Sequence, residues 1–127
     1  MTTYTQPYTP ATVPVAPPPS VTTAKGASGR TYQFQLHPVG TGYNDRSGVY
    51  IFVKRAANGG WDALYIGETG SFKRRLTDEL RLHHQWQRVV AHGATHIATL
   101  HVPGALALRE DIETDLRRAI LTPCNDQ

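Results

Sequence analysis

The sequence has few of the residues that define several protein classes. Cysteine occurs once among 127 residues, as Cys124. A disulfide framework and a cysteine-rich zinc site each need several thiols, so the sequence excludes both. We therefore expect a reducing compartment and no disulfide-linked partner.

Long hydrophobic runs are missing as well. No stretch approaches the roughly 20 apolar residues that a membrane span needs. The first residues also lack the basic start and the apolar run of a secretory signal. We therefore expect a soluble, cytoplasmic protein without a membrane partner, and the chain length gives room for one domain.

The chain carries only a small excess of positive charge. The net charge is +3, which many soluble domains carry and which does not by itself identify a nucleic-acid-binding protein. The distribution of the cations is more informative than their total. They gather in two segments, one with Lys73, Arg74, Arg75 and Arg81, the other with Arg109, Arg117 and Arg118.

The composition of the N-terminal part of the chain does not suit a packed core. Six of the nine prolines fall in the first 19 residues, and Lys25 is the only charged side chain in the first 28. This composition predicts a disordered tail over residues 1–28 and a folded domain over residues 29–127. Pro14 to Pro17 also match the P-x-x-P pattern, which is read either as a docking motif or as a solvated linker.

Apolar periodicity predicts a small sheet in the folded part. Residues 31–36 alternate between apolar and polar as a strand with one buried face does, and residues 48–54 are almost continuously apolar and β-prone. Residues 58–60, Asn-Gly-Gly, suit a tight turn into a second strand over residues 61–67. A further strand is predicted over residues 95–102.

Helical periodicity appears after the predicted hairpin. Ser71 is a plausible N-cap for a helix whose apolar face includes Leu76 and His83, and residues 84–91 predict a short helix that ends before Gly93. Residues 105–121 predict the longest helix, with an inward face made of Leu108, Ile112, Leu116 and Ala119. The predicted fold is therefore α+β, with a small central antiparallel β-sheet of three to four strands flanked by helices.

Short motifs on these elements resemble the GIY-YIG endonucleases. Gly48-Val49-Tyr50 stands where that family has G-I-Y, and Tyr65-Ile66-Gly67 is the Y-I-G itself. The similarity continues with the helix arginine and with an ending of the form E-x-x-L, P, N, represented here by Arg75, Glu113, Leu116, Pro123 and Asn125. It covers most of the predicted domain, from Gly48 to Asn125.

The resemblance implies a divalent-metal-dependent endonuclease that hydrolyses phosphodiester bonds of DNA at a single-metal site. Glu113 would hold Mg²⁺ or Mn²⁺, because a carboxylate is the hard ligand that these ions prefer. Arg75 would bind the scissile phosphate with its planar guanidinium. Tyr50 would take the proton of the attacking water, and Tyr65 would orient water or phosphate. Single-stranded DNA, branched DNA and RNA remain open as substrates.

Each of these residues also has an ordinary structural interpretation. Arg109, Glu113 and Arg117 are spaced by four residues, which is also the spacing of a salt-bridge ladder on a helix surface. Lys73 and Arg74 are read as a solvated face that makes weak contacts with a nucleic-acid backbone. Taken singly, each tyrosine is a core aromatic with its hydroxyl at the rim.

The supporting residues of the site are predicted less directly. Many members of the family carry His or Tyr four residues beyond the arginine, where this chain has Glu79. His83 and His84 are candidates for the missing acid or base because imidazole titrates near neutrality. Gly48 and Gly67 are predicted to be structural, since a side chain at Gly67 would block close packing.

Three alternatives remain. Asn125 is assigned either to nucleic-acid or water contacts or to fixing the end of the chain. A zinc site built from the histidines at 83, 84, 92, 96 and 101 is disfavoured, because Gly93 interrupts the helix that would give His92 and His96 useful spacing. The domain as a whole is also compatible with nucleic-acid binding without cleavage, or with an interaction module that recruits a partner through its proline-rich tail.

Overall fold

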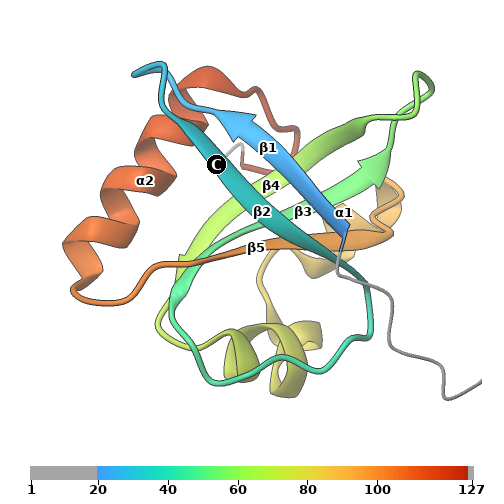
Figure 1. Ribbon diagram of the computed structural model, residues 1–127. Coiled ribbons are helices and arrows are strands. Elements are labelled where there is room, and N and C mark those ends of the chain that lie inside the picture. Colours follow the sequence, from blue (N-terminus) through green and yellow to red (C-terminus); the bar gives the residue numbers. More distant parts are fainter. Residues whose placement is uncertain (1–19, 126–127) are drawn as a thin grey trace, which may run out of the picture.

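A five-stranded, curled antiparallel sheet forms the centre of the protein in a computed structural model that describes residues 20–125 (Figure 1). The strands follow the spatial order β1-β2-β5-β3-β4. Their bounds are β1 Ser20–Lys25, β2 Thr31–Pro38, β3 Gly48–Arg55, β4 Trp61–Thr69 and β5 His96–His101. β3 therefore lies inside the sheet, and β4 lies at one edge.

The β3–β4 hairpin is the longest paired unit and forms as its sequence predicts. The turn closes through a hydrogen bond from the Ala56 amide to the Gly60 carbonyl, with 2.8 Å between N and O. Gly59 has a φ of +87°, a conformation that glycine adopts without steric cost. The register pairs Tyr50 with Gly67, and shifts by one residue after Phe52. This bulge sets which side chains of the hairpin share a face.

Two apolar cores lie on the two faces of the sheet. One contains residues of β2, β3 and β5 together with Leu116 of α2, the helix Leu106–Ala119. The other contains Tyr50, Tyr65 and Leu76, and it is covered by a π-helical turn η1 (Lys73–Asp78), a 3-10 turn η2 (Leu80–Leu82) and the helix α1 (Trp86–Ala91). The helices therefore flank the sheet on both sides, as Figure 1 shows for α1 and α2.

The sheet is larger than the sequence predicts. It has five strands instead of three to four, because residues 20–25 pair with β2 as the edge strand β1. The predicted boundary of the tail at residue 28 is therefore wrong, because the folded part includes Ser20–Lys25. Exposure of most β1 side chains explains the error, since a strand with few buried residues has no clear apolar pattern. The rest of the predicted tail, including Pro14 to Pro17, lies outside the described residues.

The predicted helix after the hairpin is broken into shorter turns. Ser71 does cap its start, since its Oγ accepts the Arg74 amide at 3.1 Å. The next turn is wider than an α-helix, because the Glu79 amide bonds to the Arg74 carbonyl, five residues back. Contacts with the preceding loop hold this segment, including a hydrogen bond from the Tyr43 amide to Thr77 Oγ1. These tertiary contacts override the α-helical periodicity.

The longest helix is shorter than predicted and partly exposed. Ile112 and Leu116 face the sheet as expected. Leu108 is 48% exposed and Ala119 is also exposed, so their predicted inward positions are wrong. The reason is that the apolar contact between α2 and the sheet begins only at Ile112. Within residues 20–125, no helix has both the length and the apolar character required to cross a bilayer.

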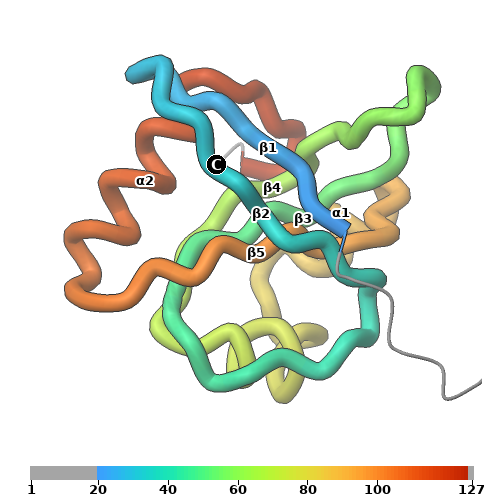
Figure 2. Tube along the Cα trace, viewed as in Figure 1, coloured from blue at the N-terminus to red at the C-terminus, as the bar shows by residue number. Residues whose placement is uncertain are grey.

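After α2, the chain returns to the free edge of β4, and Figure 2 follows this path along the trace. The Cys124 amide donates to the Leu64 carbonyl at 2.9 Å. Asn125 then binds both backbone groups of Ile66, accepting its N–H at 2.7 Å and donating to its carbonyl at 2.9 Å. The C-terminal segment is thereby hydrogen-bonded along the outer edge of β4, which brings the end of α2 beside the hairpin.

Candidate active site at the β3–β4 hairpin

The hairpin places both predicted tyrosines on one face. Tyr50 on β3 and Tyr65 on β4 lie with ring centroids 6.1 Å apart. Gly67 pairs with Tyr50 across the strands, and a Cβ atom at Gly67 would stand 2.6 Å from the Tyr50 hydroxyl oxygen. Gly67 is therefore required for the position of this phenol. Its predicted structural role is confirmed, with the phenol as the group it makes room for.

His83 joins this cluster through a short hydrogen bond. Its Nε2 lies 2.7 Å from the Tyr50 hydroxyl oxygen, and its Nδ1 accepts the Gln85 amide at 3.0 Å. A ring nitrogen that accepts an N–H carries no proton, so the neutral imidazole has its proton on Nε2. His83 therefore donates to the Tyr50 hydroxyl oxygen. The rings of Tyr50, Tyr65 and His83 also contact one another, so the three side chains form one packed cluster.

The two neighbouring histidines occupy different environments. His83 is 4% exposed, and burial lowers its pKa to about 4, with smaller contributions from the positive charges of His84 and Arg75. His84 is exposed and stacks on His83 with ring centroids 4.8 Å apart. Both therefore lie beside the tyrosines, as predicted, but His83 is neutral near pH 7 and only His84 faces solvent.

Burial dominates the electrostatics of the phenols. It raises the pKa of Tyr50, which is 1% exposed, and the charges of Tyr65 and Glu113 raise it further while Arg75 lowers it. The pKa of Tyr65 is also raised, first by burial and then by Glu113, against the lowering effects of Arg117 and Arg75. Both phenols are thus protonated at neutral pH.

Glu113 acts on this cluster by its charge, from a helix that packs on the opposite face of the sheet. It lies on α2, it is partly buried, and its charge acts on both phenols. Burial raises its own pKa, against a lowering contribution from Arg117. Its contact with Arg117 is long, with 4.0 Å between Nη1 and Oε2. The carboxylate therefore keeps oxygen atoms that are not held by a close cation within the described chain.

The predicted salt-bridge ladder forms only in part. Arg109 Nε pairs with Glu68 Oε1 at 3.0 Å, rather than with Glu113 one turn away. Glu68 follows Gly67 directly on β4, so this pair joins the sheet to α2. No role for Glu68 is predicted from the sequence, although a carboxylate near the end of a strand with buried residues is itself a signal of a polar contact.

Arg75 lies at the border of the same site. It is partly buried, and its charge lowers the pKa of Tyr50, Tyr65 and His83. Within residues 20–125, its guanidinium forms no hydrogen bond or ion pair. A guanidinium with unused donors next to two hydroxyls suits an anionic ligand.

The two cations before Arg75 are exposed, as the solvated-face interpretation requires. The α-helical spacing of four residues would place Asp78 beside Arg74, but Asp78 pairs with Lys73 instead, at 2.7 Å between Nζ and Oδ2. The wider π-helical turn explains this change, since it brings residues five apart together. The one functional role that remains predicted for Lys73 and Arg74 is contact with a nucleic-acid backbone.

Asn125 and Gly48 have structural positions. Both polar ends of the Asn125 carboxamide bind the Ile66 backbone, and Thr122 donates to the same Oδ1. Of the two roles predicted for Asn125, fixing the chain end is confirmed, and the nucleic-acid contact is not supported by this geometry. A Cβ atom at Gly48 would collide with the Leu100 carbonyl, which confirms the predicted need for glycine there.

The side chains of this site fit a hard divalent cation such as Mg²⁺ only if other ligands complete its coordination. The described residues contain no group of three or more His, Cys, Asp or Glu side chains that could hold a metal ion, and this includes the histidines considered for zinc. Glu113 is a single, partly buried carboxylate with two phenol hydroxyls nearby. Mg²⁺ commonly binds through one or two carboxylates plus waters and substrate phosphates, and Glu113 fits that pattern.

Comparisons with protein-family models, with curated proteins and with solved structures find no match.

Proposed function

We propose that this protein is a divalent-metal-dependent endonuclease of the GIY-YIG type that hydrolyses phosphodiester bonds of DNA. The observation that carries this proposal is the packing of Tyr50, Tyr65 and His83 in one cluster, with a hydrogen bond between His83 and Tyr50, within electrostatic reach of Arg75 and Glu113. These five residues come from β3, β4, the turns after β4, and α2. A purely structural cluster would not need both a guanidinium that pairs with no group among residues 20–125 and a partly buried carboxylate, each acting by its charge on the two phenols.

Each residue has a role in phosphodiester hydrolysis. Arg75 binds the scissile phosphate, and its hydrogen bonds strengthen as charge develops on the phosphate oxygens. Glu113 would hold Mg²⁺ or Mn²⁺, which when bound would polarise the phosphate and support the leaving oxygen. Tyr65 is 8% exposed and would orient the attacking water, whose proton would pass to the phenolate form of Tyr50.

His83 tunes the proton acceptor in this scheme. Its Nε2–H donates to the Tyr50 oxygen, so it stabilises a phenolate at Tyr50 without carrying a charge of its own. Binding of a cation at Glu113 would reverse the local charge that now raises the pKa of both phenols. The resting site keeps its phenols protonated, and loading the site favours the phenolate.

Two open surface grooves border the proposed site and suit a nucleic-acid backbone. One is lined by the exposed cation Arg117 together with Thr122 and Asn125, next to Glu113 in the fold. The other is lined by Ser71, Lys73 and Arg74 together with the carboxylates of Asp45, Asp78 and Glu79. Arg117 in the first groove and Arg74 in the second would contact phosphates, which predicts salt-dependent binding without strong sequence preference.

One observation favours a second candidate function, nucleic-acid binding without cleavage. Tyr50 is 1% exposed, and burial strongly raises its pKa, so its hydroxyl is a poor base in the resting structure. Arg75 and the grooves would then serve binding alone. The two functions differ in their need for a divalent metal at Glu113.

Incubation of the protein with supercoiled plasmid DNA and Mg²⁺ or Mn²⁺ tests the proposal. We expect nicking that requires the metal and that Glu113→Gln abolishes, while DNA binding persists in a gel-shift assay. Glu110→Gln is the matched control, because it removes a neighbouring exposed carboxylate from the same helix. Binding without nicking in either metal would select the second candidate.

A further inference from the structure

We propose that Glu68 is a positioning residue that holds Arg109 away from Glu113 and so keeps the Glu113 carboxylate available to a divalent cation. This inference rests on the proposed function, since it concerns the same metal-binding carboxylate. It assigns a role to the ion pair between β4 and α2 that the proposed chemistry does not itself use.

The helix gives Arg109 an obvious alternative partner. Side chains three and four residues apart on an α-helix are neighbours. Among the positions three and four residues before and after Arg109, only Glu113 is acidic. In the absence of a competitor, the expected arrangement is an Arg109–Glu113 pair, followed by the Glu113–Arg117 pair.

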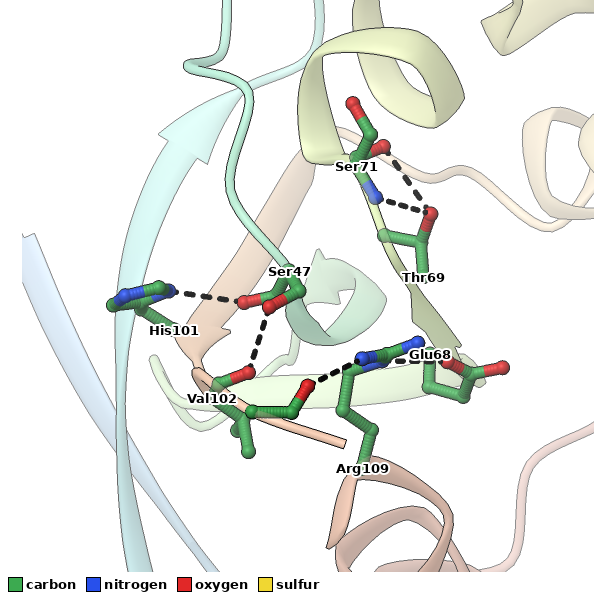
Figure 3. A network of polar contacts seen from close by, with 8 residues as sticks. Ser47, Glu68, Thr69, Ser71, His101, Val102 and Arg109 are labelled. Atoms are coloured by element: carbon green, nitrogen blue, oxygen red, sulfur yellow. Dashed lines mark hydrogen bonds and ion pairs between the residues drawn. The ribbon is translucent and has the colours of Figure 1, made fainter. Parts of the chain in front are cut away.

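The observed contacts differ from that arrangement. Arg109 Nε lies 3.0 Å from Glu68 Oε1, and its Nη1 donates to the Gly104 carbonyl at 3.3 Å. Figure 3 shows the Arg109 side chain turned toward Glu68 within the polar network at this end of the sheet. The two side chains are only 12% and 23% exposed, so the pair is shielded from solvent. A charge pair in such a place is stronger than one at the open surface.

The pairing of Arg109 has a direct consequence for Glu113. Its only ion pair in the described chain is the 4.0 Å contact with Arg117, which also donates to the Asn125 carbonyl. A close guanidinium would occupy the carboxylate oxygens and bring a positive charge against the incoming cation. Glu68 prevents this, and its own negative charge adds to the field at Glu113, whose pKa it raises.

Removal of the Glu68 charge should therefore release Arg109 toward Glu113. The guanidinium would remain largely buried without its partner, a costly state that favours the nearest carboxylate on its helix. The predicted result of Glu68→Gln is weaker metal binding, even though Glu68 itself does not bind the metal.

Titration with Mn²⁺ in the absence of DNA, followed by electron paramagnetic resonance of the free ion, tests this proposal on the full chain. We expect Glu68→Gln to weaken Mn²⁺ binding about fivefold, the equivalent of roughly 1 kcal/mol. Glu110→Gln is the matched control, because Glu110 also acts on Glu113 by its charge but has no arginine to release. We expect it to weaken binding by less than about twofold.

Variants of Arg109 separate positioning from a merely structural role. Arg109→Gln breaks the same ion pair but removes the competitor, so Mn²⁺ binding should be unchanged or tighter. Glu68→Gln combined with Arg109→Gln should return to within about twofold of the wild-type affinity. If the ion pair only stabilised the fold, both single variants would weaken binding alike, and this result would overturn the proposal.

The same titration distinguishes failure of this inference from failure of the proposed function. Equal effects of Glu68→Gln and Glu110→Gln would overturn the positioning role and leave the metal site intact. Mn²⁺ binding that survives Glu113→Gln, or no binding by the wild-type protein, would overturn both. Circular dichroism of each variant, compared with wild type, confirms that the affinities refer to folded protein.

Discussion

The Tyr50 hydroxyl oxygen lies 2.7 Å from Nε2 of His83, and the other ring nitrogen of His83 is occupied by the Gln85 amide. The backbone of the turn after η2 thereby fixes the tautomer of His83 and makes it a donor to Tyr50. A histidine held in this way resists protonation, because a proton on Nδ1 would face the Gln85 N–H. The relationship leads to a measurable effect of pH on stability.

Protonation of His83 should destabilise the protein in mild acid. The pKa of His83 is lowered to about 4 in the folded protein, from 6.5, so the unfolded chain binds more protons between these values. Its contribution to stability is complete above pH 6.5 and is lost as the pH falls toward 4. From pH 7 to 4.5 the loss is about 2 kcal/mol for this group, by the linkage between pKa and free energy.

Urea unfolding of the wild-type protein and of His83→Gln at several pH values measures this effect. The wild-type free energy of unfolding should fall more steeply with acid than that of the variant. The difference between the two isolates His83 from other groups, including His96, whose pKa is also lowered by burial. Parallel pH profiles would contradict the prediction.

Substitution of Gly67 by alanine should displace Tyr50. The added Cβ would stand 2.6 Å from the Tyr50 hydroxyl oxygen, inside normal contact distance. We expect a loss of about 1–3 kcal/mol in the free energy of unfolding, as for other overpacked cores. Gly42→Ala is the control, since a Cβ there meets no atom within 4 Å. Equal stability of the two variants in thermal or urea unfolding would rule out the proposed crowding.

Replacement of Arg75 should reduce cleavage far more than replacement of its neighbour. Arg75 acts on both phenols and His83, whereas Arg74 is exposed. We expect Arg75→Ala to lower the nicking rate on the order of 100-fold, the loss typical of a transition-state contact. Arg74→Ala should change the rate by no more than about threefold, through weaker backbone contact. Initial rates on plasmid DNA at saturating Mg²⁺ provide the comparison.

Neutralisation of Glu113 should make Tyr65 more acidic. The charge of Glu113 raises the pKa of Tyr65, second only to burial, so Glu113→Gln should lower it. NMR titration of isotope-labelled tyrosine follows the resonance of Tyr65, which is assigned by its absence from the spectrum of Tyr65→Phe. Glu110→Gln, in which the carboxylate next to Arg109 is neutralised, should leave the pKa of Tyr65 nearly unchanged. An unchanged Tyr65 titration in Glu113→Gln would show that the two groups are not electrostatically coupled.

The hairpin and the relative position of its tyrosines could be predicted from the sequence, because they depend on local patterns. The apolar run at residues 48–54, the Asn-Gly-Gly turn and the following strand determine which residues share a face. Ile112 and Leu116 likewise follow helical periodicity. The edge strand β1 could not be predicted, since its side chains are mostly exposed and its pairing depends on β2.

The parts of the site that the sequence did not predict depend on long-range contacts. Helical spacing pairs Arg109 with Glu113, yet Glu68, 41 residues away in sequence, takes Arg109 instead. Helical spacing places His83 on the inward face, but its hydrogen bond to Tyr50, 33 residues earlier in the chain, depends on packing between elements. Spacing along one element identified the candidate residues, and packing between elements decided their partners.

The backbone contacts of Cys124 and Asn125 along β4 have a consequence for behaviour at high concentration. An uncovered edge strand offers unpaired amides and carbonyls to the edge of another molecule, which is a common route to aggregation. Asn125 occupies both backbone groups of Ile66 on the outer side of β4. Cys124 and Asn125 therefore cover the edge of β4 and hinder strand-to-strand polymerisation there. This is the same edge where the proposed substrate would bind.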